Sequence, residues 1–336
     1  MIKIVFISAV AILRALSRRI AKGPAQPSWS IAFEVAIAVD RAILSETASW
    51  PTSKIQRTMK ELPGRLARQL TVSEVELGGR PAERSHLPGE EPASTLLYLH
   101  GGGFVQGSPG THRDAVSAIT LAAGCQTYSL DYRLASQHPF PAASDDVYSA
   151  YRDLLEQGVA PESLAVAGDS AGGTLTLVLL QRLRDEGLPL PAAAVPICPA
   201  PDLGFPGKSW NTSPHDCMTR EMCEIWIGHY LNGHDVKDPA VSPIHGSFQG
   251  LPPMLVQAGG LECLYDDIAS LVARIESEGA EVQFSVYPEM PHVWHLFHAL
   301  TPDGKRALDE IGSFVRTHTE KGRGQGSGRK VSAPTA

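Results

Sequence analysis

The sequence has few cysteines and no excess of basic residues, the features that disulfide-rich, zinc-binding and nucleic-acid-binding proteins need. Its 336 residues include five cysteines, an odd number without a Cys-x-x-Cys spacing. A disulfide framework and a zinc knuckle are therefore not expected, and free thiols are typical of the reducing cytoplasm. The 29 basic side chains are outnumbered by 36 acidic ones, which leaves a net charge of −7. Without a basic excess to replace phosphate counterions, a nucleic-acid partner is not expected.

Long apolar runs are also missing. The longest, from Ile4 to Leu13, spans ten residues, whereas a transmembrane helix needs roughly 18. We therefore expect no stable membrane insertion. Lys3 followed by this run resembles the start of a signal peptide, but Arg14 and Arg18 interrupt it early and no cleavage site follows.

The chain does contain a regular alternation of short apolar strands and helices. The strands are expected at residues 71–77, 95–100, 125–130, 164–167, 192–198, 253–258 and 281–287. The helices are expected at residues 111–124, 142–157, 171–186, 266–279 and 303–318. Such an alternation predicts a mostly parallel sheet covered on both faces, preceded by a hairpin that turns at Gly78-Gly79.

The N-terminal segment 1–65 lies outside this alternation and is expected to be helical. Arg14, Arg18 and Lys22 recur at a spacing of four and form a basic stripe on an otherwise apolar helix. Two interpretations compete: a lid helix that covers an apolar pocket, or a surface helix that lies on a membrane. We favour the lid, because a second apolar helix follows from Trp29 to Leu44 and can share its core.

A strand-poor insert later in the chain is expected to complete this lid. It is too rich in apolar residues to be a long surface loop. The predicted organisation is a helical cap segment at 1–65, a catalytic domain at 66–203 and 249–319, a cap insertion at 204–248 and a disordered tail at 320–336.

The sequence around Ser170 predicts a nucleophilic serine. Gly168-Asp-Ser-Ala-Gly172 follows a short apolar strand and opens a long apolar helix, which is the setting of a nucleophile elbow. A serine on such a sharp turn needs small neighbours two positions away on each side. The following helix directs its first N–H groups at the position where an oxyanion would develop.

A base is expected just after the last strand, at His292. The chain order Ser, then acid, then His, each on a loop after a strand, matches this class of hydrolase. His295 is the alternative base, and it also opens the pattern His292, His295, His298. We do not expect that pattern to bind a metal, because no carboxylate-rich loop accompanies it.

The acid is expected in the loop after the strand 253–258. Glu262 lies in the loop itself, whereas Asp266 stands where a helix begins and acidic residues usually serve as caps. We therefore predict Glu262 as the residue that orients the imidazole, with Asp266 as the alternative. Either type of carboxylate can hold the imidazole tautomer.

The glycine triplet after the strand 95–100 predicts an oxyanion hole. Gly102 and Gly103 let backbone N–H groups approach a substrate carbonyl, and the N–H of Ala171 is expected to join them. A nucleotide-binding loop is not expected, since Gln106 stands where such a loop needs its last glycine.

Together these motifs resemble the hormone-sensitive-lipase family of α/β-hydrolases, in particular its bacterial esterases, over residues 28–318. The motifs that carry the resemblance are His100-Gly-Gly-Gly103, Asp131-Tyr-Arg-Leu-Ala135, His138-Pro-Phe-Pro-Ala142, Gly168-Asp-Ser-Ala-Gly172, Asp238-Pro239 with Ser242-Pro243, and Pro288-Glu-Met-Pro-His292. The resemblance implies an α/β-hydrolase fold, with a mostly parallel sheet of about eight strands and a helical cap. This chain departs from the family at Glu262, where the family usually has Asp. Glu262 stands 30 positions before His292, a separation similar to that in the family.

These motifs and the resemblance predict a serine carboxylesterase without cofactor or metal. It is expected to act on short- to medium-chain esters through Ser170, His292 and Glu262. An amidase, lactonase or deacetylase with the same triad is the alternative. A non-catalytic small-molecule receptor is a third reading, and the presence of both Ser170 and His292 speaks against it. Because a general base must be neutral, activity is expected to fall as the pH drops through about 6.5.

Aromatic residues of the expected cap are the predicted substrate-binding residues. They are Trp29, Phe33, Trp210 and Trp226, which suit an apolar acyl pocket or, equally well, the core of the lid. The expected partner is a small-molecule ester, the expected location is the cytoplasm, and a homodimer is the assembly considered.

Overall fold

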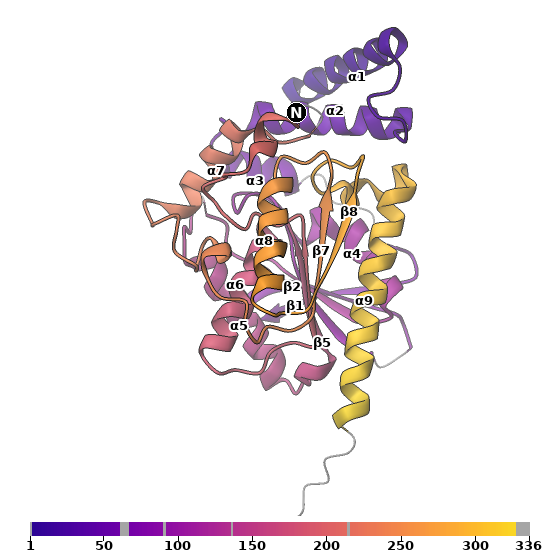
Figure 1. Cartoon of the computed structure of the whole chain (residues 1–336). Coiled ribbons are helices and arrows are strands. Elements are labelled where there is room, and N and C mark those ends of the chain that lie inside the picture. Colours follow the sequence, from indigo (N-terminus) through magenta and orange to yellow (C-terminus); the bar gives the residue numbers. More distant parts are fainter. Residues whose placement is uncertain (1, 61–66, 90–91, 136, 214–215, 327–336) are drawn as a thin grey trace, which may run out of the picture.

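The computed structural model describes every residue except 1, 61–66, 90–91, 136, 214–215 and 327–336 (Figure 1). Its strands are β1 (Thr71–Leu77), β2 (Arg80–His86), β3 (Thr95–Leu99), β4 (Gln126–Leu130), β5 (Leu164–Asp169), β6 (Ala193–Ile197), β7 (Met254–Gly259) and β8 (Val282–Tyr287). Its α-helices are α1 (Ile2–Lys22), α2 (Ile31–Thr47), α3 (Thr52–Lys60), α4 (Pro109–Ala123), α5 (Ala142–Glu156), α6 (Ala171–Asp185), α7 (Arg220–Leu231), α8 (Tyr265–Ser277) and α9 (Pro302–Gly326). Short 3-10 turns are η1 (Pro161–Ser163), η2 (Lys208–Asn211), η3 (Pro243–His245) and η4 (Trp294–Leu300).

One eight-stranded sheet organises the molecule, in the order β1-β2-β4-β3-β5-β6-β7-β8. The hairpin β1–β2 is antiparallel, with Thr71 opposite His86 and Leu77 opposite Arg80, and β2 also runs antiparallel to β4. From β4 to β8 all neighbours are parallel. Every residue of β3, β5, β6 and β7 is buried, because both faces of a parallel sheet are covered by helices. The predicted fold class is confirmed.

The helices cover both faces of this sheet. Figure 1 shows α5, α6 and α8 on one face and α4 and α9 on the other. Local signals set the helix ends: Ser108 caps α4 in a capping box with Thr111, and Gly124 ends it in the left-handed conformation at φ 64°. Helix α9 continues to Gly326, past the predicted helix end at 318 and into the segment expected to be disordered. The rest of that predicted tail lies outside the described residues.

A helical cap covers one end of the sheet. Figure 1 places α1, α2 and α3 there together with α7 of the insert, as the sequence predicts. Ser30 and Thr219 start α2 and α7 by accepting hydrogen bonds from the third helical N–H group. The expected cap boundary near residue 65 lies among residues the structure leaves undescribed, so the domain limits stay predictions. Within the described ranges, no helix combines the length and apolar character needed to cross a bilayer.

Candidate active site

Ser170 stands on the turn between β5 and α6 in a strained backbone conformation, with φ 52° and ψ −118°. The turn leaves no room for a side chain two positions before or two positions after Ser170. A Cβ on Gly172 would lie 1.9 Å from the carbonyl oxygen of Leu99, and one on Gly168 would lie 2.4 Å from the Gly172 carbonyl oxygen. Both positions therefore require glycine, which is the reason the motif has them.

A continuous line of hydrogen bonds joins Ser170, His292 and Glu262. The Oγ of Ser170 lies 2.9 Å from Nε2 of His292, and Nδ1 of His292 lies 2.7 Å from Oε2 of Glu262. The other carboxylate oxygen, Oε1, accepts the N–H of Gly259 at 2.7 Å. Glu262 is fully buried and His292 is 5% exposed. The carboxylate is thus held by two donors, and the imidazole is held between acid and hydroxyl.

The surroundings favour a basic imidazole at His292. Burial by itself would lower the pKa of His292, but the hydrogen bond and charge of Glu262 outweigh it, so the pKa is raised above its usual value. Asp216 and Asp169 act in the same direction. The pKa of Glu262 is raised as well, because burial exceeds the lowering effect of its bond to His292. The acid limb of activity is therefore expected above pH 6.5 rather than at it.

Gly102, Gly103 and Ala171 line the same cavity as Ser170. Both glycines have positive φ, 118° and 59°, which places them in backbone regions that favour glycine. A Cβ on Gly103 would lie 2.5 Å from the ring of Trp226. All three positions predicted as oxyanion donors therefore line the cavity that contains Ser170.

Asp169 ties the glycine loop to the strand that carries the serine, a role that the sequence analysis did not assign. Its carboxylate accepts the Tyr98 hydroxyl at 2.8 Å and the N–H of Gly101 at 3.0 Å, and lies 3.3 Å from Nε2 of His112. Burial by itself would raise the pKa of Asp169, but His112 and Tyr98 outweigh it and lower the pKa to about 2. Burial by itself would lower the pKa of His112, but the charge and hydrogen bond of Asp169 outweigh it and raise the pKa.

The two alternative residues of the sequence analysis are engaged elsewhere. Nε2 of His295 lies 2.8 Å from the side-chain oxygen of Gln257, and burial lowers the pKa of His295 to about 3. Asp266 lies in the first turn of α8 but accepts the N–H groups of Lys208 and Ser209 in η2, each at 2.9 Å, so it holds the start of η2 rather than capping its own helix.

The cavity beside Ser170 has a volume of about 260 Å³ and is walled by both parts of the cap and by the catalytic domain. Trp210 and Trp226 line it. Among the described residues, neither Trp29 nor Phe33 belongs to its wall. Their rings pack edge to face in the core, with centroids 5.0 Å apart. The indole N–H of Trp29 donates to the carbonyl of Glu289 at 2.6 Å, so this ring anchors the cap rather than facing a substrate.

Asp216 of the insert holds the loops of the base and the acid together. It is fully buried, and Oδ1 accepts the backbone N–H of His292 at 3.0 Å, while Oδ2 accepts that of Cys263, next to Glu262, at 2.7 Å. The sequence analysis did not identify it, because a lone Asp in a segment without a motif carries no signal.

Asp40 of α2 brings a second unpredicted carboxyl group to the cavity wall. Burial raises its pKa to about 6, against the effect of a hydrogen bond from the Cys217 thiol, and the nearby charge of Asp216 adds to the rise. Asp40 thus adds a carboxyl group that changes charge near pH 6 to a cavity wall that also includes the pair His112 and Asp169.

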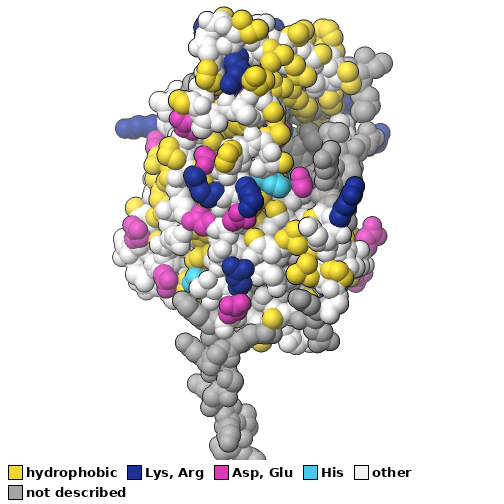
Figure 2. Space-filling view, turned by 90° about the vertical axis from the view of Figure 1, so that its right-hand side faces the viewer, with side chains coloured by type: hydrophobic (Ala, Val, Ile, Leu, Met, Phe, Trp, Pro, Cys, Tyr) yellow, Lys and Arg dark blue, Asp and Glu magenta, His cyan; other side chains and the backbone are white. Residues whose placement is uncertain are grey.

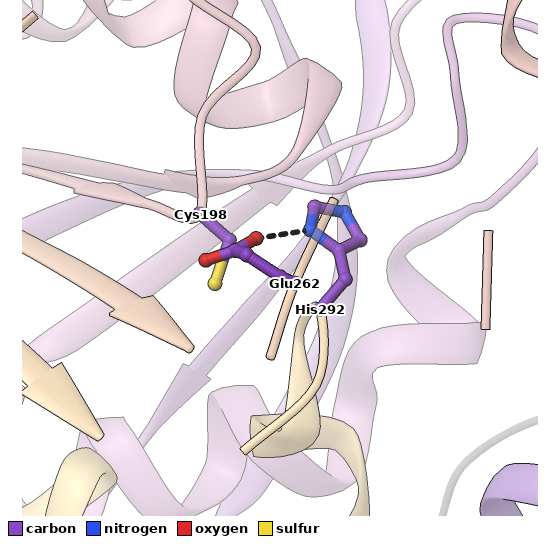
Figure 3. A group of neighbouring side chains, drawn as sticks. All are labelled: Cys198, Glu262 and His292. Carbon is purple, nitrogen blue, oxygen red and sulfur yellow. Dashed lines mark hydrogen bonds and ion pairs between the residues drawn. The ribbon is translucent and has the colours of Figure 1, made fainter. Parts of the chain in front are cut away.

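Cys198, Glu262 and His292 offer ligand atoms within 4.8 Å of one another, and Figure 3 shows their side chains converging. These three side chains interact through hydrogen bonds and a protonated thiol rather than as metal ligands. Burial and the charge of Glu262 raise the pKa of the Cys198 thiol well above its usual value, so the thiol stays protonated. Nδ1 of His292 is already engaged by Glu262. We assign no metal to this group.

Comparisons with known proteins agree with this geometry. Residues 96–296 match the model of a family described as having the alpha/beta hydrolase fold. An acetyl-hydrolase of Streptomyces hygroscopicus is 45% identical over 237 residues, which cover 70% of this chain and 79% of that protein. A crystal structure of an esterase/lipase from an uncultured bacterium has 39% identity and a TM-score of 0.78, covering 84% of this chain and 98% of the other. An esterase of the bacterial hormone-sensitive lipase family has 35% identity and a TM-score of 0.75, covering 95% and 99%. The chain therefore belongs to the α/β-hydrolase family, as a carboxylic ester hydrolase of the bacterial hormone-sensitive-lipase group.

Proposed function

We propose that the protein hydrolyses short- to medium-chain carboxylic esters through an acyl-enzyme on Ser170, with His292 as base and Glu262 as the acid that orients it. The observation that carries this proposal is the unbroken line from Oγ through the imidazole to the buried carboxylate, at 2.9 and 2.7 Å. These distances lie within the reach that proton transfer requires.

In the first half-reaction, Nε2 of His292 takes the hydroxyl proton while Oγ of Ser170 attacks the ester carbonyl. Glu262 stabilises the imidazolium that forms, since its charge lies against Nδ1. The N–H groups of Gly102, Gly103 and Ala171 would receive the oxyanion. His292 then protonates the alkoxide leaving group.

In the second half-reaction, the neutral imidazole activates a water molecule that attacks the acyl group on Ser170. The proton on His292 returns to the serine when the tetrahedral intermediate collapses. The residues present supply every proton transfer, so the scheme needs no cofactor.

The size of the cavity supports a preference for shorter acyl chains. Its volume of about 260 Å³ lies just below the range of about 300–1,000 Å³ for small-molecule sites. Trp210 and Trp226 supply an apolar wall, and of the four aromatic residues predicted to bind substrate we retain these two.

Initial rates on p-nitrophenyl esters from acetate to palmitate, measured for the wild type and for Ser170→Ala, test this proposal. We expect turnover to decline with chain length in the wild type and to vanish in the variant. A Ser170→Ala variant that hydrolyses these esters as fast as the wild type would contradict the proposal.

Removal of an acetyl group from an amide by the same triad is the second candidate, since one relative is named an acetyl-hydrolase, a name that fits an acetyl ester and an acetyl amide alike. p-Nitroacetanilide beside p-nitrophenyl acetate distinguishes the two. The predicted partner is a small-molecule ester. A cytoplasmic location, which the five free and buried cysteines support, and a homodimer stay predictions.

A further inference from the structure

Helix α1 turns alanines, two arginines and a few half-buried apolar side chains toward the protein. Its buried residues are Ala11 and Ala15. Arg18 and Arg19 reach the buried carboxylate of Glu34 on α2, at 2.5 and 2.6 Å. Burial would raise the pKa of Glu34, but the bonds from the two guanidinium groups outweigh it and lower the pKa. Since a buried charge needs partners, this cluster sets the rotation of α1 about its axis.

The opposite face of α1 is apolar and faces solvent. Five of the nine large apolar side chains that are exposed among the described residues belong to this helix: Val5 (63%), Phe6 (68%), Ile12 (36%), Leu13 (66%) and Ile20 (88%). A spacing of seven residues is nearly two helical turns, so Phe6, Leu13 and Ile20 form one stripe that is about 21 Å long. Figure 2 shows hydrophobic side chains gathered at the end of the molecule where Figure 1 places α1 and α2. An exposed patch of this kind marks an interaction surface.

The charge of α1 indicates what covers this surface. The helix holds five Lys and Arg residues and no Asp or Glu, in a chain with a net charge of −7. Lys3, Arg18 and Arg19 pair with carboxylates of α2, and Arg14 and Lys22 are exposed. A second copy placed on the same face would oppose two basic helices. An anionic bilayer satisfies both features, because lipid headgroups attract the cations and acyl chains accept the stripe.

We propose that α1 binds the surface of an anionic phospholipid bilayer, lying in the plane of the interface with Phe6, Leu13 and Ile20 inserted below the headgroups. No membrane crossing is involved. Helix α1 lies on α2, and α2 contributes Asp40 and Leu44 to the cavity wall. Docking through α1 therefore places the cap, and the cavity beneath it, at the membrane surface.

Flotation of the full chain with vesicles tests the proposal. We expect the protein to float with vesicles made of equal parts phosphatidylglycerol and phosphatidylcholine, and not with phosphatidylcholine alone. The double variant Phe6→Glu, Leu13→Glu is expected to reduce the bound fraction by about tenfold or more, since charges replace the inserted side chains. Val286→Glu on β8, a side chain that is 36% exposed, is the matched control and is expected to float like the wild type.

Hydrolysis of soluble p-nitrophenyl acetate is measured on all three proteins, and we expect equal rates because α1 lies outside the cavity wall. This readout separates failure of the membrane proposal from failure of the esterase. The proposal is overturned if the wild type does not float with anionic vesicles, if it floats equally with phosphatidylcholine, or if the double variant floats unchanged. Sedimentation equilibrium adds one more outcome: a wild-type dimer that the double variant splits, without vesicle binding, would make the face a contact between copies.

Discussion

Glu262→Gln removes the charge of the proposed triad acid and keeps its size and shape. The carboxylate oxygen lies 2.7 Å from Nδ1 of His292. At that distance two unit charges attract by about 6 kcal/mol at an effective dielectric constant of about 20. The imidazolium that forms in the transition state would lose this attraction. Since 1.36 kcal/mol is a factor of ten in rate, about 3 × 10⁴-fold is the upper bound on the loss of kcat.

The structure also predicts how the glutamine side chain will orient. The N–H of Gly259 donates to Oε1 at 2.7 Å and requires an oxygen there. The amide –NH2 then faces Nδ1 of His292, so Nδ1 must accept a hydrogen bond. The neutral imidazole must therefore carry its proton on Nε2 instead. Nε2 is the atom that has to accept the proton of Ser170. Wrong tautomer and lost charge act together, and we expect a loss of kcat of about 10³–10⁴-fold.

Initial rates on p-nitrophenyl acetate across a pH series measure both effects. We expect the acid limb of Glu262→Gln at lower pH than in the wild type, because Glu262 is the main group that raises the pKa of His292. Glu262→Asp keeps the charge and is expected to recover part of the rate. Asp266→Asn is the matched control and is expected to keep kcat near wild type. A folded Glu262→Gln protein that loses less than about tenfold, or an Asp266→Asn protein that loses as much, would refute this assignment.

Three further changes test the surroundings of the triad. Gly103→Ala adds a Cβ to a residue with φ 59°, 2.5 Å from the Trp226 ring. We expect kcat to fall by about 10²–10³-fold while the circular dichroism spectrum stays that of the folded protein. An unchanged kcat would remove Gly103 from the proposed oxyanion hole. Asp169 has a lowered pKa of about 2, so it contributes stability above pH 4 that is lost as the pH falls through 2, about 2 kcal/mol at pH 7. Asp169→Asn also leaves His112 without its ion pair, and we expect urea unfolding at pH 7 to show a loss of about 2–4 kcal/mol; equal stability of the two proteins would contradict this. The raised pKa of Asp40, about 6, makes its ionised form unfavourable in the folded state, so stability is lost as the pH rises from 4 to 6. Asp40→Asn is therefore expected to raise the melting temperature at pH 8 and to leave it nearly unchanged at pH 4, and the same shift at both pH values would argue against a titrating Asp40.

The secondary-structure elements and the candidate nucleophile could be predicted because their signals are local. The apolar strands alternate with helices along the chain, and the glycines around Ser170 are demanded by contacts within the turn and with the adjacent strand. The order of Ser170, Glu262 and His292 follows from where the strands end. Such features depend on neighbours close in sequence, so they can be read without knowing how distant segments meet.

The supporting groups of the site could not be predicted in this way. Asp216 bonds the backbone of His292, 76 positions along the chain, and Asp40 reaches the cavity from α2. Neither residue belongs to a motif. The four cap aromatics illustrate the same limit: composition alone does not distinguish Trp226, which lines the cavity, from Trp29, which anchors the cap to Glu289.

The sequence by itself thus determined the α/β-hydrolase architecture, its family and the candidate catalytic residues, because periodicity, glycine positions and motif spacing are written in consecutive residues. The tertiary structure alone decided which carboxylates hold the loops of the triad and which aromatics face the cavity. It also decided that α1 turns its apolar stripe to solvent, since the pairing of Arg18 and Arg19 with Glu34 sets the rotation of that helix. Side-chain direction depends on packing between segments far apart in the chain, and no local pattern encodes it.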